Sequence, residues 1–302
     1  MALHGLPAAD SQYRIATAVL TTRRSDGPLQ RRANVRHVGR CPALAMSRRE
    51  MRSIMAWSLT SWLLLLGAAC ASSRPDGEDG GSGPSGTSSA RTDEALAAAR
   101  ARMVVDQLEA RGIQDARVLA AMRDIPRHRF VPVEMVPDAY ADTPLPIGHG
   151  QTISQPYIVA LMTELARPRP TDKALEIGTG SGYQAAVLAR VAARVFTIEF
   201  VPALAAVAAP RLAIYPNVVV REGDGYGGWP EQAPFDIILV TAAPEEVPPA
   251  LLDQLAIGGR LVIPIGPTTA AQELKLIEKR ADGSLTTTNV TPVRFVPLLR
   301  RE

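Results

Sequence analysis

Three glycines stand at alternate positions in the stretch LEIGTGSGYQ, directly after an apolar run. They are Gly178, Gly180 and Gly182. Glycine at such a turn tolerates positive φ and lets the backbone approach a ligand closely. A dinucleotide fingerprint places its third glycine five residues after the first, where it opens a helix under a pyrophosphate. Tyr183 stands at that position here, so the spacing weakens a nicotinamide-nucleotide interpretation.

Acidic residues stand at the ends of three successive predicted strands. Glu176 precedes the glycine turn, Glu199 ends the run VFTIEF, and Asp224 lies within REGDGYGG. The first suits an ammonium group, the second can accept both ribose hydroxyls, and the third can reach an adenine amino group. S-adenosylmethionine carries all three groups and no phosphate, so the set predicts this cofactor, with Thr179 and Gly225 also in its site. A single strand-end acid can equally be a helix cap.

The elements that must position these residues are strands that alternate with helices. Five apolar runs fit buried strands: Ala174–Ile177, Val195–Ile198, Val218–Val220, Ile237–Val240 and Arg260–Pro264. Such alternation implies a parallel sheet covered on both faces, with the ligand at the carboxyl ends of its strands. Two more strands, Glu273–Glu278 and Val293–Leu298, have no clear helix between them, which predicts an antiparallel edge. The predicted fold class is therefore α/β, with a doubly wound and mostly parallel seven-stranded sheet.

A helical and loop-rich extension precedes this sheet. Thr92 can cap a helix whose apolar residues keep helical spacing until Gly112, and Asp115 can cap a second, shorter helix. The region 126–155 is rich in proline and glycine, so we predict that it is mostly loop. A further helix is predicted over Tyr157–Leu165.

Basic residues concentrate at the start of the chain. Residues 1–70 hold ten arginines and three acids, so in a chain of net charge +3 the remainder has a net charge of −4. We therefore expect no nucleic-acid partner for the folded domain, because such binding needs a basic face. No metal site is expected either. Cys41 and Cys70 both lie in the leader, and His128 and His149 are too far apart in sequence for a helical zinc pair.

A signal-like segment occupies residues 48–70 of this basic leader. Arginines precede an apolar stretch that ends in LLGAAC, which resembles the lipobox of bacterial lipoproteins, with Cys70 as the lipidated residue. A signal that begins about fifty residues into the chain would fit if Met46, Met51 or Met55 were the true start; alternatively, Met1 is the start and the segment is only a hydrophobic tether. Gly, Ser and Pro dominate residues 71–91, which predicts a disordered linker, so the folded domain is predicted to span 92–302.

Several motifs together resemble the protein-L-isoaspartate O-methyltransferase family. The most specific is PLPIGHGQTISQPYIVA at 144–160, and a general methyltransferase would not share its GQTISQP. The segments IPRHRFVP, LEIGTGSGYQ, GDGYGGWPEQAPFDIILVTAA and VRFVPL also resemble this family, so the resemblance runs from about Met103 to Leu298. It implies the class I S-adenosylmethionine-dependent methyltransferase fold. It also implies that the methyl acceptor is the α-carboxylate of an L-isoaspartyl residue in a damaged protein or peptide, which is a repair function.

The resemblance further implies which residues act on the acceptor. Ser154 corresponds to the serine treated as the active-site residue, with Thr152 assisting it, although Ser154 can also be read as a cap of the following helix. An α-carboxylate with a pKa near 3.5 is already ionised at neutral pH, so no general base is required. Catalysis would rest on alignment of the reacting atoms and exclusion of water. Arg294 could pair with the acceptor carboxylate, and Tyr140 and Asp142 are further candidates for shaping the peptide cleft.

Two other functions remain open from the sequence. One is a different methyltransferase on the same fold, and the other is a membrane-anchored binding protein that has lost turnover. We expect the protein to be a monomer. We expect it in the cytoplasm, because the donor is made there. The alternative is a cell-envelope lipoprotein anchored at Cys70, since basic residues before Ser53 favour export of the chain beyond the apolar stretch and would associate the leader with a membrane.

Overall fold

The computed structural model describes residues 86–301, with side chains from Thr92 onward. These residues belong to one compact unit. The predicted leader 1–70, its signal-like segment and Cys70 lie outside the described residues, as does the predicted linker up to residue 85. Among the residues that are described, no helix is both long and apolar enough to cross a membrane.

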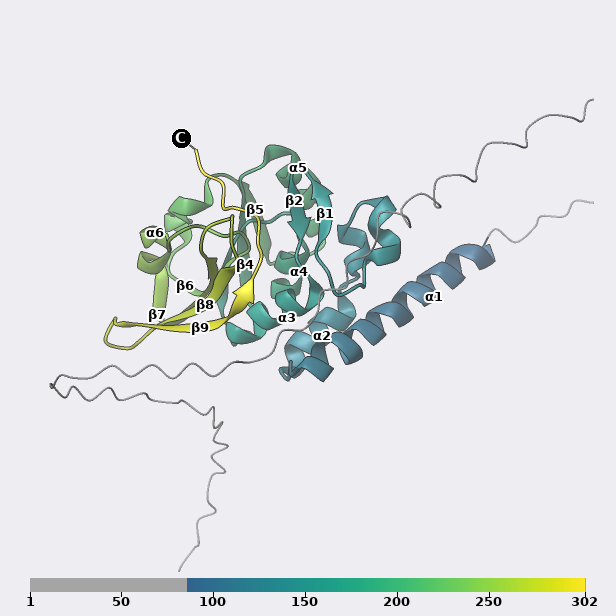
Figure 1. Ribbon diagram of the computed structural model, residues 1–302, viewed down its shortest axis with the longest axis horizontal. Coiled ribbons are helices and arrows are strands. Elements are labelled where there is room, and N and C mark those ends of the chain that lie inside the picture. Colours follow the sequence, from purple (N-terminus) through teal and green to yellow (C-terminus); the bar gives the residue numbers. More distant parts are fainter. Residues whose placement is uncertain (1–85, 302) are drawn as a thin grey trace, which may run out of the picture. The chain divides into compact units, whose positions relative to one another are not determined.

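A seven-stranded sheet in the order β5-β4-β3-β6-β7-β8-β9 forms the centre of this unit (Figure 1). Its strands are β3 (Lys173–Ile177), β4 (Arg194–Glu199), β5 (Val218–Glu222), β6 (Phe235–Val240), β7 (Leu255–Ile265), β8 (Gln272–Lys279) and β9 (Leu285–Val293). Strands β3 to β7 pair in parallel, whereas β8 pairs with both its neighbours in antiparallel register. The mostly parallel sheet with an antiparallel edge is therefore confirmed.

The strand order reverses at β3, because β4 follows it on one side and β6 lies on the other. At such a switch point the connections leave in opposite directions, which opens a crevice at the carboxyl ends of the strands. The glycine turn predicted to hold a ligand begins directly after β3, so the topology places it in this crevice.

Alternate side chains of the strands enter two apolar cores, one on each face of the sheet. On β3, Ala174 packs into the first core, whereas Leu175 and Ile177 pack into the second. The first core is covered by α2 (Ala116–Asp124), α3 (Pro156–Leu165), α4 (Tyr183–Ala189) and part of α5 (Pro202–Leu212). The second core includes residues of α6 (Pro249–Asp253).

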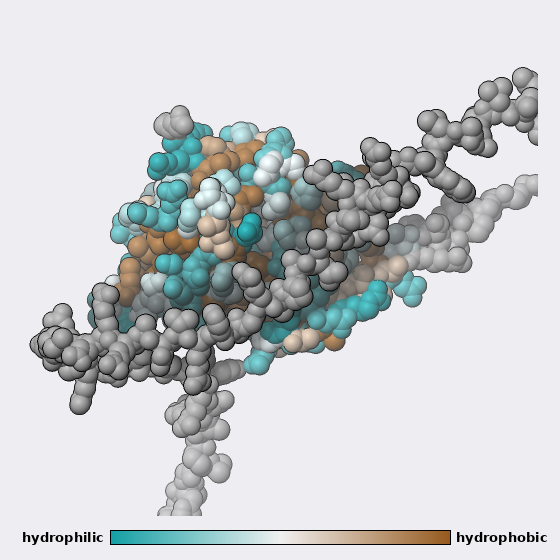
Figure 2. All heavy atoms as spheres, viewed as in Figure 1, coloured by the Kyte–Doolittle hydropathy of each residue, from teal (hydrophilic) through white to brown (hydrophobic). Residues whose placement is uncertain are grey.

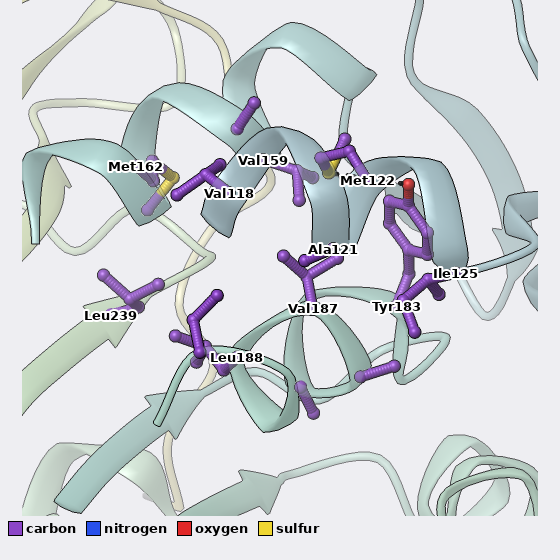
Figure 3. Packing of buried hydrophobic residues seen from close by; sticks show 14 of the residues in the cluster. Val118, Ala121, Met122, Ile125, Val159, Met162, Tyr183, Val187, Leu188 and Leu239 are labelled. Atoms are coloured by element: carbon purple, nitrogen blue, oxygen red, sulfur yellow. Dashed lines mark hydrogen bonds between the residues drawn. The ribbon is translucent and has the colours of Figure 1, made fainter. Parts of the chain in front are cut away.

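Helices α2, α3 and α4 meet over the first core, although they are distant in sequence (Figure 3). Met122 of α2, Val159 of α3 and Val187 of α4 lie close together there, each 2% exposed or less. Tyr183 is also fully buried, with its hydroxyl 3.7 Å from Met122 Sδ. Because Tyr183 follows the last glycine of the turn, this packing fixes the helix that ends the turn.

The N-terminal helical extension starts earlier than predicted. Helix α1 spans Gly86–Arg102 and continues through a π-helical turn, η2 (Met103–Leu108), and a 3₁₀ turn, η3 (Glu109–Arg111), to Gly112. Gly112 ends the run, as predicted, with a φ of 93°. The predicted cap at Thr92 was wrong, because α1 already begins at Gly86 and Thr92 lies within it.

The region predicted as mostly loop is largely without α-helix or β-strand, but it contains a hairpin of β1 (Leu145–Gly148) and β2 (Gln151–Ile153) besides the 3₁₀ turns η4 (Arg127–Phe130) and η5 (Val133–Asp138). The prediction of the last strand was wrong. The last strand is β9, and Val293–Leu298 is not a regular strand. β9 lies at the sheet edge and only its last residue is buried, so its polar TTTN run fits there, whereas Val296–Leu299 line the first cavity.

Large exposed apolar side chains are scattered over the described surface. They are Val105, Val133, Val207, Ile214, Ile257 and Leu285, and each comes from a different segment. On the face that Figure 2 shows, hydrophilic and hydrophobic residues are interspersed. Scattered apolar residues of this kind need no partner to explain them.

Candidate active site

A cavity lies at the carboxyl ends of β3, β4 and β6, with an empty volume of about 730 Å³ that is partly open to solvent. Eight residues predicted from the sequence line it: Thr152, Ser154, Glu176, Gly178, Thr179, Gly180, Glu199 and Gly225. The structure thus brings together residues from the glycine turn, from a second strand end and from the β2 hairpin. The predicted site residues Gly182 and Asp224 lie next to lining residues but do not line the cavity themselves.

The glycine turn adopts backbone conformations that other residues rarely adopt. Gly178, Gly180 and Gly182 have φ values of 97°, 52° and 89°. A Cβ on Gly178 would stand 2.6 Å from Thr241 Oγ1, and one on Gly182 would stand 3.2 Å from Leu212. The alternating glycines are therefore required both by the turn and by close contacts around it.

Glu176 is fully buried and stands at the base of the cavity. Its register partner on β4 is Thr197, whose hydroxyl donates to Glu176 Oε2 at 2.6 Å and lies 2.6 Å from the Thr179 hydroxyl. The other oxygen, Oε1, has no hydrogen-bond partner within the described residues. The pKa of Glu176 is raised to about 8, mainly because the carboxyl group is buried. The hydrogen bond from Thr197 lowers this pKa, and the negative charge of Glu199 raises it. A ligand cation would satisfy the free oxygen and favour the carboxylate.

Glu199 connects the glycine turn with the start of α5. Its Oε2 accepts from the backbone N–H of Gly180 at 2.6 Å, and its Oε1 accepts from the N–H of Val201 at 2.9 Å. Val201 is the N-cap residue of α5, and no side chain caps this helix, so Glu199 is not the helix cap that was the alternative interpretation of a strand-end acid. Its side chain lines the cavity, and each carboxylate oxygen retains capacity for a further donor such as a hydroxyl.

Asp224 has two backbone donors in this structure. Oδ1 accepts from Tyr226 N–H at 2.9 Å, which caps the short turn η6 (Gly225–Gly227), and Oδ2 accepts from Arg301 N–H at 3.1 Å. The neighbouring Gly225 lines the cavity, and a Cβ there would overlap the side chain of Ile177. The described structure thus places Asp224 at the margin of the cavity, with the C-terminal segment over it.

A second cavity adjoins the first and is lined partly by the same residues. Its empty volume of about 1040 Å³ includes space open to solvent, and Thr152, Ser154, Thr241 and Val296 line both cavities. Gln155, not Ser154, is the N-cap residue of α3, and the Ser154 hydroxyl makes no hydrogen bond among the described residues. The helix-cap alternative for Ser154 is thus not what the structure shows. Its hydroxyl is free at the boundary between two cavities.

Of the remaining predicted residues, Arg294 lies at the second cavity, Tyr140 is buried away from both cavities, and Asp142 is exposed. Arg294 is exposed and lines the second cavity. Tyr140 and Asp142 line neither cavity: the Tyr140 hydroxyl lies 2.7 Å from His128 Nδ1, and Asp142 forms an ion pair with Arg111 at 2.7 Å. The structure therefore gives Tyr140 and Asp142 partners away from the cavities.

Sequence reasoning did not assign Thr241 or the C-terminal segment 296–299 to the site, yet both line the first cavity. Thr241 directly follows β6, so the strand-end rule that identified Glu176 and Glu199 would also have found it. The C-terminal segment reaches the cavity through backbone pairing. Ala243 N–H donates to Val296 O at 2.8 Å, and Leu298 N–H donates to Ala243 O at 2.9 Å. No local sequence signal predicts this long-range pairing.

Comparisons with known proteins cover most of the described chain. The family model for protein-L-isoaspartate(D-aspartate) O-methyltransferase matches residues 99–302. The protein-L-isoaspartate O-methyltransferase of Opitutus terrae is 56% identical over 72% of this chain and 94% of its own length. That of Gloeobacter violaceus is 55% identical over 66% of this chain and 98% of its own. A solved Plasmodium falciparum structure described as such an enzyme, in complex with S-adenosyl-L-homocysteine, aligns with a TM-score of 0.57 at 28% identity, over 66% of this chain and 97% of its own.

Proposed function

Since this chain belongs to the protein-L-isoaspartate O-methyltransferase family, we propose that its two adjoining cavities hold the two substrates of a protein-repair methylation. The chain is a methyltransferase that transfers a methyl group from S-adenosylmethionine to L-isoaspartyl residues of proteins or peptides. In our proposal the donor occupies the cavity at the glycine turn. The acceptor peptide occupies the second cavity, and its α-carboxylate meets the donor at the shared wall.

The donor cavity fits the amino-acid end of S-adenosylmethionine. The free Oε1 of buried Glu176 needs a partner, and the donor's ammonium group can supply one. Gly178 and Gly180 both line this cavity with positive φ, so the backbone of the turn is exposed to a ligand without side chains of its own. These two observations support donor binding by Glu176, Gly178, Thr179 and Gly180, with Gly182 shaping the turn.

The other end of the donor would extend toward β4 and β5. Glu199 lines the cavity and has capacity to accept ribose hydroxyls beside its two backbone donors. Gly225 lines the same wall. For Asp224 to accept from an adenine amino group, its carboxylate would add that donor to Tyr226 N–H or exchange it for Arg301 N–H.

Ser154 provides the single observation on which the acceptor assignment rests. Its hydroxyl has no partner among the described residues and stands in the wall common to both cavities. From there it can donate to one oxygen of an acceptor carboxylate and leave the other oxygen free to attack. Thr152 lines the same wall and can donate beside it.

The chemistry asks little of proton transfer from this chain. S-adenosylmethionine supplies, when bound, an electrophilic methyl group on a sulfonium. The acceptor carboxylate is already ionised near neutral pH, so no residue has to remove a proton. The residues instead bind, orient and exclude water: Glu176 holds a charge, Ser154 orients a carboxylate, and the apolar C-terminal residues Val296–Leu299 cover one side of the donor cavity.

Arg294 is proposed to attract acidic groups of the acceptor to the second cavity. It is exposed and lines this cavity, where its guanidinium can pair with a peptide carboxylate. Because an exposed ion pair contributes little, we expect Arg294→Ala to raise the KM for the peptide by about two- to fivefold without changing kcat.

The proposed function is tested with the full chain, radiolabelled S-adenosylmethionine and a pair of synthetic peptides that differ only at one aspartyl residue. The isoaspartyl peptide should gain a base-labile methyl ester, and the normal aspartyl peptide should gain none. Donor binding without any ester on the isoaspartyl peptide would support a binding protein that has lost turnover. Methylation of some other acceptor alone would support a different methyltransferase.

The compartment and the oligomeric state are also proposals. We propose a cytoplasmic monomer, supported by the cytoplasmic origin of the donor and by the scattered exposed apolar residues of the described domain. Mass spectrometry of the mature N-terminus, together with cell fractionation, tests this proposal. A lipidated Cys70 in the membrane fraction would replace it with the envelope lipoprotein.

A further inference from the structure

We propose that the hydroxyl oxygen of Thr241 accepts C–H···O contacts from the sulfonium methyl of the donor and so holds this methyl group in place for its transfer to the acceptor carboxylate. This inference rests on the proposed function, since it assumes the donor in the first cavity and the acceptor in the second. Thr241 would then be a catalytic residue beyond Ser154 and Thr152. The position of its side chain and the direction of its hydroxyl hydrogen both support this role.

Thr241 stands where the two substrates must meet. It lines both cavities, and its half-buried side chain directly follows β6. Its backbone N–H donates to Ile177 O at 2.9 Å, so pairing between β3 and β6 extends to Thr241. A residue held by the sheet at this point keeps its position better than a residue of a free loop.

The hydrogen of the Thr241 hydroxyl is already committed. Oγ1 lies 2.9 Å from Ile177 O and 2.6 Å from Gly178 O, and both of these atoms are acceptors. A hydroxyl has one hydrogen and two lone pairs, so the hydrogen points at the backbone. Among the described residues no group donates to Oγ1. Its lone pairs are therefore what this side chain offers to a ligand.

Thr241 also fits closely against the glycine turn. Its Oγ1 would stand only 2.6 Å from a Cβ on Gly178, so the oxygen occupies the space that a side chain at position 178 would need. Because Gly178 has no side chain, the Thr241 hydroxyl oxygen can lie against this first residue of the turn, with its lone pairs free. A glycine there serves the threonine as well as the ligand.

The charge of the donor decides what such an oxygen can do. The positive sulfur polarises the methyl C–H bonds, so an oxygen lone pair attracts them. The demethylated product, S-adenosylhomocysteine, has a neutral thioether and no methyl group, but otherwise the same adenosine and amino-acid parts. A contact with the methyl group must therefore favour the donor over the product. A merely structural role of Thr241 would affect both ligands alike.

The experiment measures the dissociation constants of S-adenosylmethionine and S-adenosylhomocysteine by calorimetry, for the full chain and its variants. In Thr241→Val we expect the affinity for the donor to fall about fivefold and that for the product less than about twofold. Thr241→Ser, which keeps the oxygen, should retain the wild-type ratio. Thr197→Val is the matched control, because Thr197 bonds to Glu176, whose proposed ligand group is common to both compounds. It should weaken both equally.

An unchanged ratio of the two dissociation constants in Thr241→Val would overturn the proposal, whether both affinities fall or neither does. Thermal unfolding of each variant shows whether it is folded. If Thr241→Val does not fold, Thr241→Ala is judged by the same ratio. Failure of the wild-type chain to bind either compound would instead contradict the proposed function, so the two failures are distinct.

Discussion

Ligand binding at the glycine turn should depend steeply on pH because of Glu176. The free protein has a Glu176 pKa of about 8, raised mainly by burial, so at pH 7 the carboxyl group is mostly neutral. If the ammonium group of the ligand binds the ionised form, the apparent dissociation constant is the intrinsic one divided by the ionised fraction. That fraction rises from about 1% at pH 6 to about 9% at pH 7, so the affinity should rise about ninefold.

S-adenosylhomocysteine is the suitable probe, because it carries the same amino-acid end and lacks the reactive methyl group. Its α-amino group, with a pKa near 8, stays protonated over this pH range. Calorimetry at pH 6 and pH 7, in buffers of different ionisation enthalpy, measures both the affinity and the protons released. We expect release of about 0.9 proton per ligand at pH 7. Glu176→Gln should abolish both the slope and the release.

Two variants around Glu176 should move this pH dependence in opposite directions. Thr197 lowers the pKa of Glu176 through its hydrogen bond, so Thr197→Val should shift the rise in affinity to higher pH. Glu199 raises that pKa by its charge, so Glu199→Gln should shift the rise to lower pH. A flat affinity between pH 6 and pH 7 in the wild-type chain, without proton release, would refute the assignment of Glu176 to the ammonium group.

Three further predictions address stability and turnover. Ser154→Ala should lower kcat at least about tenfold while the donor dissociation constant stays within about twofold, because the free hydroxyl binds only the acceptor. Unchanged turnover would remove Ser154 from the catalytic residues. Gly225→Ala should lower the free energy of unfolding by about 1–3 kcal/mol in denaturant titrations, because its Cβ would overlap Ile177; a wild-type midpoint would contradict this packing. Without ligand, the free energy of unfolding of the wild-type chain should fall by on the order of 4 kcal/mol between pH 4.5 and pH 8. Denaturant unfolding at several pH values measures this fall, and Glu176→Gln should remove it.

The sign of this pH effect on stability is set by the raised pKa of Glu176. Between the ordinary value of 4.5 and the folded value of about 8, the folded state binds a proton that the unfolded state releases. The stability associated with this group is therefore fully present below pH 4.5 and declines as the pH rises toward 8. Ligand binding should offset the decline, because an ammonium group stabilises the ionised carboxylate.

The strands of the parallel sheet could be predicted because both of their faces are buried. Ile237–Val240 is a continuous apolar run and Ala174–Ile177 is apolar except for Glu176, and each coincides with a strand within two residues at either end. The edge strand β9 gives no such signal, since most of its residues are exposed and polar. The segment Val293–Leu298, apolar except for Arg294, was therefore mistaken for the strand, although its apolar side chains pack into the cores or line the donor cavity.

The candidate site was predictable where local sequence fixes the chemistry. The turn from Gly178 to Gly182 and the acid before it act within a few residues of one another, so their pattern is visible in the sequence. Thr241 could have been found by the strand-end rule, but a lone threonine carries no chemical signal by itself. The positions of Tyr140 and Asp142 depend on partners distant in sequence, such as Arg111, and no short pattern reveals those partners.

Glu176 connects the stability of the domain with its ligand. A fully buried carboxyl group with an unpartnered oxygen lowers the stability of the free protein, and a better-packed apolar residue would remove that cost. The apolar residue would also remove the carboxylate that recognises a cation at the end of β3. The raised pKa of Glu176 reflects both the lower stability of the free protein and its affinity for a cation. Ionisation is unfavourable without ligand, and a bound cation offsets this unfavourable free energy. On this reasoning, a variant that stabilises the free chain at position 176 must lose affinity for the donor by a comparable free energy.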